Sequence, residues 1–313
     1  MLSLLLLASL PSALCANERA TLEETAARIE HAYVIEAEAQ RIAGELRALS
    51  AKADQAGECM AREEFARALT RTLRDVSGDG HFYIEVEKRS EGDDWITSWR
   101  ASGFKRGQGI TRVEILDDNI GYIRIRSFYE LEAAYPHLRG AFDMVASTDA
   151  LILDLRSNGG GSSQTTWPVQ WTFLEPGSPS PMTMQSRLEG TKPREEPPVL
   201  WERYGTERPL AILIDQDTFS APEAVAFTLQ LAGRATIVGE RSGGGAHMLD
   251  DGDDLTTGFT LYTPTSRPLS VATGSNWEGV GVGPDIAAEP EEAIARAAEA
   301  LRKQLARLTA PVE

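Results

Sequence analysis

Hydrophobic positions recur at helical spacing in the first quarter of the chain. Between residues 21 and 73, apolar side chains stand three or four positions apart, as at Ile29 and Tyr33 and again at Ile42 and Leu46. The stretch is rich in Ala, Glu and Arg and holds no proline. One face of each predicted helix is therefore apolar. The pattern predicts a small N-terminal helical domain, which we place at residues 17–76.

After Gly78 the pattern changes to short β-prone runs separated by Gly, Asp and Pro. The predicted strands cover residues 82–86, 121–125, 151–155, 210–214 and 236–238, and the predicted helices cover residues 131–146, 221–231 and 290–308. Strands interleaved with helices are typical of a mixed α/β domain with crossover connections. We place this core at residues 77–313, with the last helix closing the chain.

Residues 176–209 carry many prolines and several charges. Such a composition predicts a long excursion over the surface. It is either a lid or strap, or a plain surface connection.

The first sixteen residues have no charged side chain. They are apolar from Leu2 to Leu10 and then turn small and helix-breaking through Pro11, Ser12 and Ala13. The apolar part is too short to span a bilayer as a helix, so residues 1–16 are predicted to be a secretory signal peptide. A periplasmic or secreted protein beginning near Ala16 is expected. The alternative is that the true start codon lies elsewhere, or that this segment forms an apolar strand.

The chain has two cysteines. If cleavage follows Cys15 or Ala16, only Cys59 remains, so no disulfide is expected within the mature chain. Lipidation at Cys15 is another possibility, but Ser12-Ala13-Leu14 matches a lipoprotein box poorly.

Composition restricts the class of protein. With 42% hydrophobic and 25% charged residues among 313, the chain resembles an ordinary soluble globular protein. Its formal net charge of −16 argues against nucleic acid or anionic membranes as partners, because both are bound through Lys and Arg.

Ser220 stands where a predicted strand gives way to a predicted helix. Pro222 follows near the first helical turn, where its missing amide is harmless. Ser220 and Glu223 also form the Ser-x-x-Glu pattern of a capping box. Ser220 is therefore either a helix N-cap or a nucleophile, and the second reading needs a base and an oxyanion site elsewhere.

Candidates for both exist. His81 follows a glycine at the entry to a strand and is the favoured base, while His247, which follows three glycines, is its rival. Gly159 and Gly160 follow the strand 151–155 and can present bare amides. Together with the amide of Ala221, they could hold a developing oxyanion. The alternative is that these glycines only form a tight turn.

Several further motifs occur in a fixed order, namely Gly80-His81, Gly121-Tyr122-Ile123-Arg124-Ile125, Leu153-Asp154-Leu155-Arg156-Ser157-Asn158-Gly159-Gly160-Gly161, Phe219-Ser220-Ala221-Pro222-Glu223-Ala224, Gly239-Glu240, and Glu278-Gly279-Val280-Gly281-Val282-Gly283-Pro284-Asp285. In this order they resemble the C-terminal-processing, or tail-specific, serine peptidases. The similarity is to the branch of the tricorn protease core and the interphotoreceptor retinoid-binding protein repeats. The resemblance implies a crotonase-like mixed α/β core preceded by a small helical domain.

The resemblance also separates two mechanisms. Processing peptidases with a Ser/Lys dyad carry a lysine in a Gly-Lys-Gly segment that aligns with Gly243-Gly244-Gly245, and that lysine is absent here. The tricorn-like branch instead implies Ser220 as nucleophile, His81 as base and Glu278 as the carboxylate that orients the base. This chain has Gly80 where tricorn-like enzymes have a serine.

The sequence thus predicts a secreted or periplasmic serine-type peptidase that acts on peptides or polypeptides. No cofactor and no metal are expected, and a homo-oligomer is possible. No stretch is long enough for a PDZ module between the helical domain and the core. The alternative is a non-catalytic module of the same fold that binds an apolar ligand or a partner.

Overall fold

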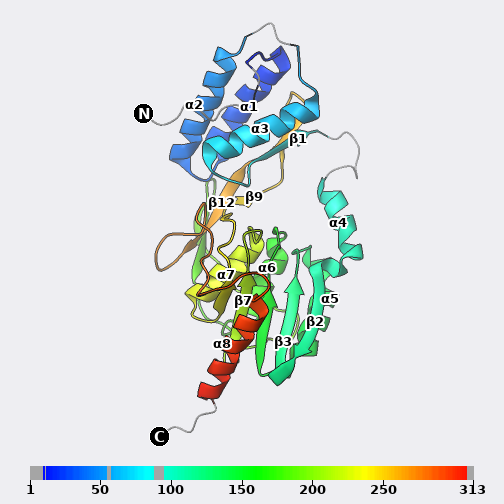
Figure 1. Ribbon diagram of the computed structural model, residues 1–313. Coiled ribbons are helices and arrows are strands. Elements are labelled where there is room, and N and C mark those ends of the chain that lie inside the picture. Colours follow the sequence, from blue (N-terminus) through cyan, green and yellow to red (C-terminus); the bar gives the residue numbers. More distant parts are fainter. Residues whose placement is uncertain (1–9, 11, 55–57, 88–94, 309–313) are drawn as a thin grey trace. The chain divides into compact units, whose positions relative to one another are not determined.

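The computed structural model describes residues 10, 12–54, 58–87 and 95–308, in two compact units (Figure 1). Unit 1 comprises Met1–Glu91, Thr183–Lys192 and His247–Leu269. Unit 2 comprises Gly92–Met182, Pro193–Ala246 and Ser270–Glu313. The expected boundary at residue 76 thus differs from the observed grouping, since unit 1 also takes in two later segments of the chain.

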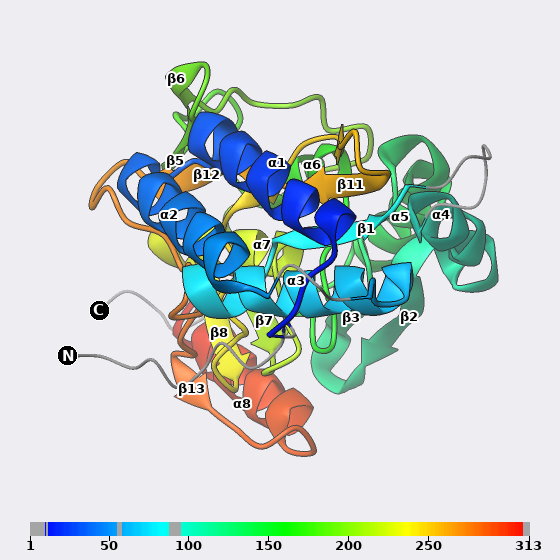
Figure 2. The ribbon, with the colours of Figure 1, turned by 90° about the horizontal axis from the view of Figure 1, so that it is seen from above.

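Three helices dominate unit 1, as the apolar spacing predicts. They are α1 (Ala16–Ala32), α2 (Glu36–Lys52) and α3 (Arg62–Ser77). In Figures 1 and 2, α1 and α2 run side by side and α3 crosses them. Their apolar faces share one core, in which Leu22, Ile29, Ile42, Leu46 and Leu69 are fully buried.

Unit 1 also contains strands from distant parts of the chain. An antiparallel sheet has the order β1-β11-β10, and a second sheet has the order β6-β5-β12-β9. The bounds are β1 (Tyr83–Val86), β5 (Met182–Ser186), β6 (Gly190–Pro193), β9 (Met248–Leu249), β10 (Asp253–Asp254), β11 (Phe259–Tyr262) and β12 (Pro264–Ser270). Ile84 and Leu261 join the helical core. The helices therefore need these later strands to bury their apolar faces.

The proline-rich stretch 176–209 is more regular than expected. It contains β5 and β6, and the part that follows β6 runs without a helix or strand as far as β7 (Leu210–Ile214). Its prolines stand mainly outside these strands, where no ladder hydrogen bond is lost.

Unit 2 is built on a six-stranded sheet of order β13-β8-β7-β4-β3-β2. Its remaining strands are β2 (Ile110–Leu116), β3 (Ile120–Ile125), β4 (Ala150–Asp154), β8 (Thr236–Gly239) and β13 (Ile286–Ala287). Only the pairing of β2 with β3 is antiparallel, and the other pairings are parallel. The expected mixed α/β core is confirmed.

Helices cover both faces of this sheet. On one face lie α5 (Leu131–Val145), α6 (Ser163–Trp171) and α7 (Ala221–Leu231), and on the other lies α8 (Ala293–Leu308). Leu153 and Ile212 face the first group, whereas Ile152 and Leu213 face α8, as the alternation along a strand requires. Strand β7 is apolar throughout because both of its faces are buried. One further helix, α4 (Trp95–Lys105), precedes β2.

The parallel arrangement brings three loops to one edge of the sheet. β4, β7 and β8 run in the same direction, so their carboxyl ends lie together. The loops that follow carry Gly160, Ser220 and Gly245, respectively. Ligands of open α/β sheets bind at this edge.

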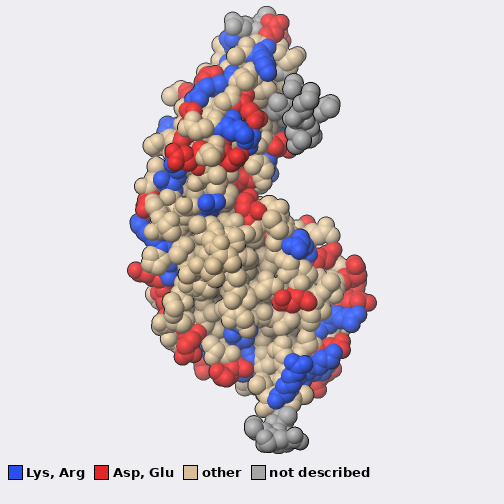
Figure 3. Space-filling view, turned by 90° about the vertical axis from the view of Figure 1, so that its left-hand side faces the viewer, with Lys and Arg blue, Asp and Glu red and all other residues tan. Residues whose placement is uncertain are grey.

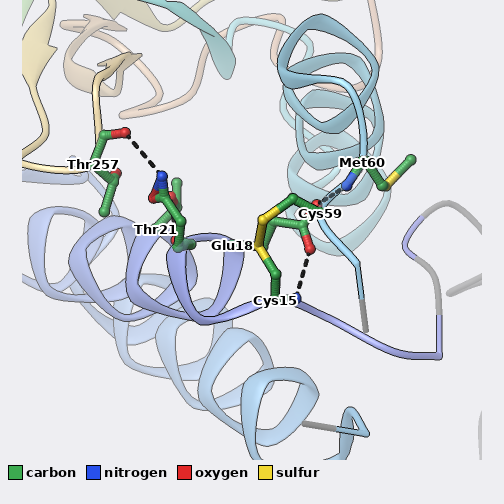
Figure 4. Close-up of a disulfide and its surroundings, with 7 residues drawn as sticks. Cys15, Glu18, Thr21, Cys59, Met60 and Thr257 are labelled. Carbon is green, nitrogen blue, oxygen red and sulfur yellow. Dashed lines mark hydrogen bonds between the residues drawn. A yellow bond between two sulfur atoms is a disulfide. The ribbon is translucent and has the colours of Figure 1, made fainter. Parts of the chain in front are cut away.

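A disulfide joins Cys15 to Cys59 within unit 1 (Figure 4). The buried Glu18 carboxylate accepts hydrogen bonds from the amide of Cys15 at 2.9 Å and from that of Met60 at 2.7 Å, so it ties together the two segments that carry the cysteines. The expectation that no disulfide forms applied to a chain cleaved after Cys15 or Ala16, and the chain that retains Cys15 pairs it with Cys59. Cys15 is also the N-cap residue of α1.

The surface carries charges of both signs. On the face shown in Figure 3, acidic and basic side chains are interspersed. Among the described helices, none combines the length and the apolar character needed to cross a membrane.

Candidate active site

Ser220 has an unusual backbone conformation. It is the N-cap residue of α7, with φ +69° and ψ −116°, in a region that side chains other than glycine rarely adopt. An ordinary N-cap has extended dihedral angles. A sharp, strained turn between a strand and a helix is the setting that exposes a nucleophilic serine in other hydrolases. Ser220 is half-buried.

The Glu223 carboxylate holds this turn. It is fully buried in the first turn of α7 and accepts a hydrogen bond from the Ser220 amide at 2.6 Å, as the capping-box pattern predicts. It also accepts hydrogen bonds from Ser242 Oγ at 2.6 Å and from the amides of Gly244 and Gly245 at 2.7 and 2.8 Å. Four donors thus join the Ser220 turn to the loop after β8.

Burial raises the pKa of the Glu223 carboxyl group above its usual value. The hydrogen bonds from Ser242, Gly245, Gly244 and Ser220 act in the opposite direction, because donors favour the ionised form. The carboxylate therefore depends on all of these donors for its stability in the interior.

The glycine loop after β4 lies against Ser220. A Cβ atom on Gly160, which has φ +122°, would stand 3.2 Å from Ser220 Cβ and 3.6 Å from Ser220 Oγ. The amide of Phe219 donates to the carbonyl of Asn158 at 3.0 Å, which fastens the two loops together. Glycine is therefore required at position 160 both for its dihedral angle and for the space it leaves.

The amides of this loop differ in what they bind. The Gly160 amide donates to Asn158 Oδ1 at 2.9 Å, so it is already occupied. Within the described chain, the amides of Gly159 and Ala221 donate no hydrogen bond to another protein group. Gly159 is exposed, and Ala221 is the first residue of α7, where an amide has no partner in its own helix.

A buried ion pair fixes the start of the glycine loop. Asp154, at the end of β4, accepts hydrogen bonds from Arg156 Nη2 and from the Tyr122 hydroxyl, both at 2.6 Å. Burial alone would raise the pKa of Asp154, but these hydrogen bonds bring it below its usual value. Burial and Asp154 also raise the pKa of Tyr122 to about 12.

Glu278 lies against the glycine-rich loop after β8. Its Oε2 atom accepts a hydrogen bond from the Ala246 amide at 2.6 Å. Next to it, the indole of Trp277 donates to the carbonyl of Gly245 at 2.8 Å. Since the Gly245 amide is bound to Glu223, Ser220 and Glu278 belong to one hydrogen-bonded network in unit 2.

His81 belongs to unit 1, where it lies beside Asp79. The buried Asp79 carboxylate accepts a hydrogen bond from the His81 amide at 2.9 Å, and its Oδ1 atom is 3.6 Å from His81 Nδ1. Its Oδ2 atom is 2.6 Å from His247 Nδ1 and accepts a hydrogen bond from the Tyr33 hydroxyl at 3.2 Å. Both candidate bases therefore share one carboxylate.

Although burial would raise the pKa of Asp79, the hydrogen bonds with His247 and His81 bring it well below its usual value. Asp79 is therefore held as a carboxylate. His247 is itself 4% exposed, whereas His81 is partly exposed.

Five of the six predicted residues belong to unit 2, namely Ser220, Gly159, Gly160, Ala221 and Glu278, and among them Gly160 lies against Ser220. His81 lies in unit 1, and its pairing with Ser220 stays a prediction. Sequence reasoning missed Asp79. Its position two residues before His81, across a glycine, is the signal that could have indicated it.

Comparison with known proteins identifies related sequences. A sequence model described as Peptidase family S41 matches residues 119–288, which is more than half of the chain. A carboxy-terminal-processing protease of Bartonella bacilliformis is 30% identical over 193 residues, covering 56% of this chain and 40% of that protein. A carboxyl-terminal-processing protease of Synechocystis is 35% identical over 136 residues, covering 41% of this chain and 30% of that protein.

The chain therefore spans less than half the length of these curated relatives. Solved structures agree with the fold. A putative peptidase from Parabacteroides merdae has a TM-score of 0.63 at 21% identity, covering 92% of this chain and 96% of that one. The tricorn protease has a TM-score of 0.57 at 14% identity, covering 94% of this chain and 37% of that one. These likenesses confirm the expected fold, including its helical N-terminal part.

Proposed function

Because this chain belongs to peptidase family S41, we propose that it hydrolyses peptide bonds with Ser220 as the nucleophile, His81 as the general base and Glu278 as the carboxylate that orients His81. The strained conformation of Ser220, held by the Glu223 hydrogen bond, is the observation that carries the proposal. A plain helix cap would not need it.

The roles follow from acid–base chemistry. His81 accepts the hydroxyl proton of Ser220 as Oγ attacks the scissile carbonyl carbon. Collapse of the tetrahedral intermediate breaks the C–N bond, and His81 returns the proton to the leaving amine. Water then hydrolyses the acyl-enzyme by the same steps. Glu278 stabilises the imidazolium that forms each time.

We place the oxyanion hole at the amides of Gly159 and Ala221, which have no other partner within the described chain. The predicted third donor, Gly160, has its amide bound to Asn158, so its contribution is to let the loop approach Ser220 closely. Preorganised amides of this kind lower the barrier by about 3 kcal/mol each in other serine hydrolases.

Continuity of the chain supports the pairing of His81 with Glu278. Ala246 and His247 are consecutive residues. The first donates to Glu278, and the second is bound to Asp79, two positions before His81. The backbone itself thus links the carboxylate in unit 2 to the histidine segment in unit 1.

The proposed substrates are peptides or polypeptides. Curated relatives are named carboxy-terminal-processing proteases, so cleavage near a carboxyl terminus is part of the proposal. We also propose that the protein acts in a periplasmic or secreted location, because disulfides such as Cys15–Cys59 persist in oxidising compartments.

The test is labelling by a fluorophosphonate probe, together with cleavage of a peptide library read by mass spectrometry. The wild-type protein should be labelled and should cleave a subset of peptides, whereas Ser220→Ala should fold and do neither. Equal labelling of the two proteins would show that Ser220 is not the nucleophile. A wild-type protein that binds peptides without cleaving them would favour the non-catalytic module.

A further inference from the structure

Arg194 is a buried cation. It directly follows β6, belongs to unit 2 and is only 9% exposed. Burial lowers the pKa of its guanidinium to about 9, because the charged form loses its hydration. The group still carries its charge near neutral pH. Its desolvation is therefore a cost that some interaction has to offset.

No carboxylate offsets that cost within the described chain. Arg194 forms no ion pair and donates no hydrogen bond there, and its one specific contact is the Trp167 ring, whose centroid lies 4.0 Å from its guanidinium carbon. Glu196, two residues after Arg194, forms an ion pair with Arg203 and accepts a hydrogen bond from the Gly177 amide. Buried arginines normally have an acidic partner, so Arg194 is an exception.

The guanidinium is nevertheless open to a ligand. None of its nitrogens is among the fully enclosed side-chain atoms that lack a hydrogen bond. Since these nitrogens also donate to no described residue, they keep some exposed surface and their N–H groups are not taken up by protein acceptors. The guanidinium carbon lies over the Trp167 ring, which holds the group in place. The planar fork of N–H donors of an arginine suits a carboxylate, which it can bind through two parallel hydrogen bonds.

Trp167, over which Arg194 lies, is near the glycine loop along the chain. Trp167 is on α6, which begins two residues after Gly161, and Gly160 stands against Ser220. A helix rises about 1.5 Å per residue, so Trp167 is roughly 6 Å along α6 from its start. An extended peptide covers about 3.3 Å per residue, so a residue roughly three to five positions from the scissile bond could contact Arg194.

We infer that Arg194, stacked on Trp167, is a specificity subsite that binds a carboxylate of the peptide substrate. This inference rests on the proposed peptidase function. The carboxylate is either the terminal carboxylate of the peptide or the side chain of an Asp or Glu residue. A dedicated cation is needed because the chain, with a formal net charge of −16, repels anionic peptides in general.

The experiment compares peptides that share one cleavable sequence. One pair ends in a carboxylate or an amide, and other pairs carry Glu or Gln at successive positions on either side of the scissile bond. The wild-type protein should cleave one acidic form roughly tenfold to hundredfold better in kcat/KM, mainly through KM, as expected for a charged hydrogen bond. The pair that shows the preference identifies the source of the carboxylate.

Two substitutions of Arg194 separate charge from packing. Arg194→Met keeps a long apolar side chain against Trp167 and should reduce the acidic-to-neutral ratio of kcat/KM to about one, whereas Arg194→Lys should retain part of it. The matched control is Lys192→Met, which removes an exposed cation two positions away that pairs with Glu189 and should leave the ratio unchanged. Equal losses for acidic and neutral peptides in Arg194→Met would show that Arg194 serves packing alone.

A binding measurement makes the inference independent of catalysis. Fluorescence anisotropy on the Ser220→Ala protein should show tighter binding of the preferred acidic peptide than of its neutral partner, and Ser220→Ala/Arg194→Met should bind both alike. If the wild-type protein cleaves nothing but this difference is seen, the peptidase proposal fails and the carboxylate subsite stands. If cleavage is seen without any acidic preference in rate or binding, the subsite is wrong.

Discussion

The Glu223 carboxylate lies 2.6 Å from the amide of Ser220 and binds the loop after β8 with its remaining hydrogen bonds. One buried side chain thus sets both the strained turn of the proposed nucleophile and the loop on which Glu278 rests. Loss of its charge should disturb both together.

We expect Glu223→Gln to lower kcat/KM by at least tenfold while the protein stays folded. The amide of Gln has one accepting oxygen, and its NH₂ group would face donors that now bind the carboxylate. Each buried donor left without an acceptor costs about 1–3 kcal/mol. The rate of fluorophosphonate labelling measures the effect, and Glu132→Gln on the exposed surface of α5 is the control. An unchanged labelling rate would contradict this role.

Gly160→Ala should abolish peptidase activity, whereas it should lower the free energy of unfolding only about as much as a control glycine-to-alanine change does. The added methyl would stand 3.2 Å from Ser220 Cβ, at a dihedral angle that alanine tolerates poorly. The control is Gly177→Ala, where φ is +73° and no atom lies within 4 Å of the added methyl. In urea unfolding, backbone strain should lower the free energy of unfolding of both variants by about 1 kcal/mol or more. Only Gly160→Ala should also lose probe labelling.

The two histidines bound to Asp79 should differ in their response to truncation. His81→Ala should fold and lose activity by orders of magnitude, because a nucleophile and its base fail as a unit. His247→Ala leaves the Asp79 carboxylate without its closest partner, so it should destabilise unit 1 by on the order of 3 kcal/mol. Thermal unfolding and probe labelling distinguish the two effects. Full activity in a stable His81→Ala protein would show that the base is misassigned.

Asp79 should make stability depend on pH in acid. Its pKa is lower in the folded protein than in an unfolded chain, where it is about 3.9. The carboxylate therefore contributes its full stability above that value, and the contribution is lost as the pH falls toward the folded-state value. The stability difference between wild type and Asp79→Asn, measured by urea unfolding, should shrink below about pH 4. A difference that does not change with pH would contradict this.

The disulfide predicts where a mature chain can begin. The carbonyl of Ser12 accepts a hydrogen bond from Asp54, Leu14 is buried and Cys15 is paired with Cys59. A protein cleaved after Ala16 would lose these contacts, and removal of a disulfide typically costs about 2–4 kcal/mol. We therefore expect cleavage, where it occurs, to precede Ser12. Intact-mass analysis of protein from the native host, without reduction, tests this, and a stable form beginning at Ala16 would contradict it.

Clear hydrophobic boundaries explain which elements could be predicted. The strand 210–214 and the helix 221–231 were predicted with the bounds that the structure shows, because an apolar run and a helix-start signal delimit them. In contrast, α6 contains Thr165, Thr166 and Pro168, which are poor helix formers, and tertiary packing overrides that preference. Strand β12 was missed for a similar reason, since prolines stand within it.

The residues of the candidate site also divide into those that the sequence could predict and those that it could not. Ser220 and Glu278 lie in recognisable local motifs. The contacts of Asp79 and Glu223 join residues that are far apart in the chain, such as Asp79 with His247 and Glu223 with Gly244. A single sequence carries no periodicity or spacing that indicates such pairs. Their importance follows only from burial and hydrogen-bond geometry.

The division into units limits which fragments of this chain can be produced or exchanged. The backbone passes between the units after residues 91, 182, 192, 246 and 269. A recombinant fragment that stops at residue 91 would lack β10 and β11, so Ile84 and the helices around it would lose their cover. Unit 1 therefore cannot be produced or exchanged as one continuous segment of the chain.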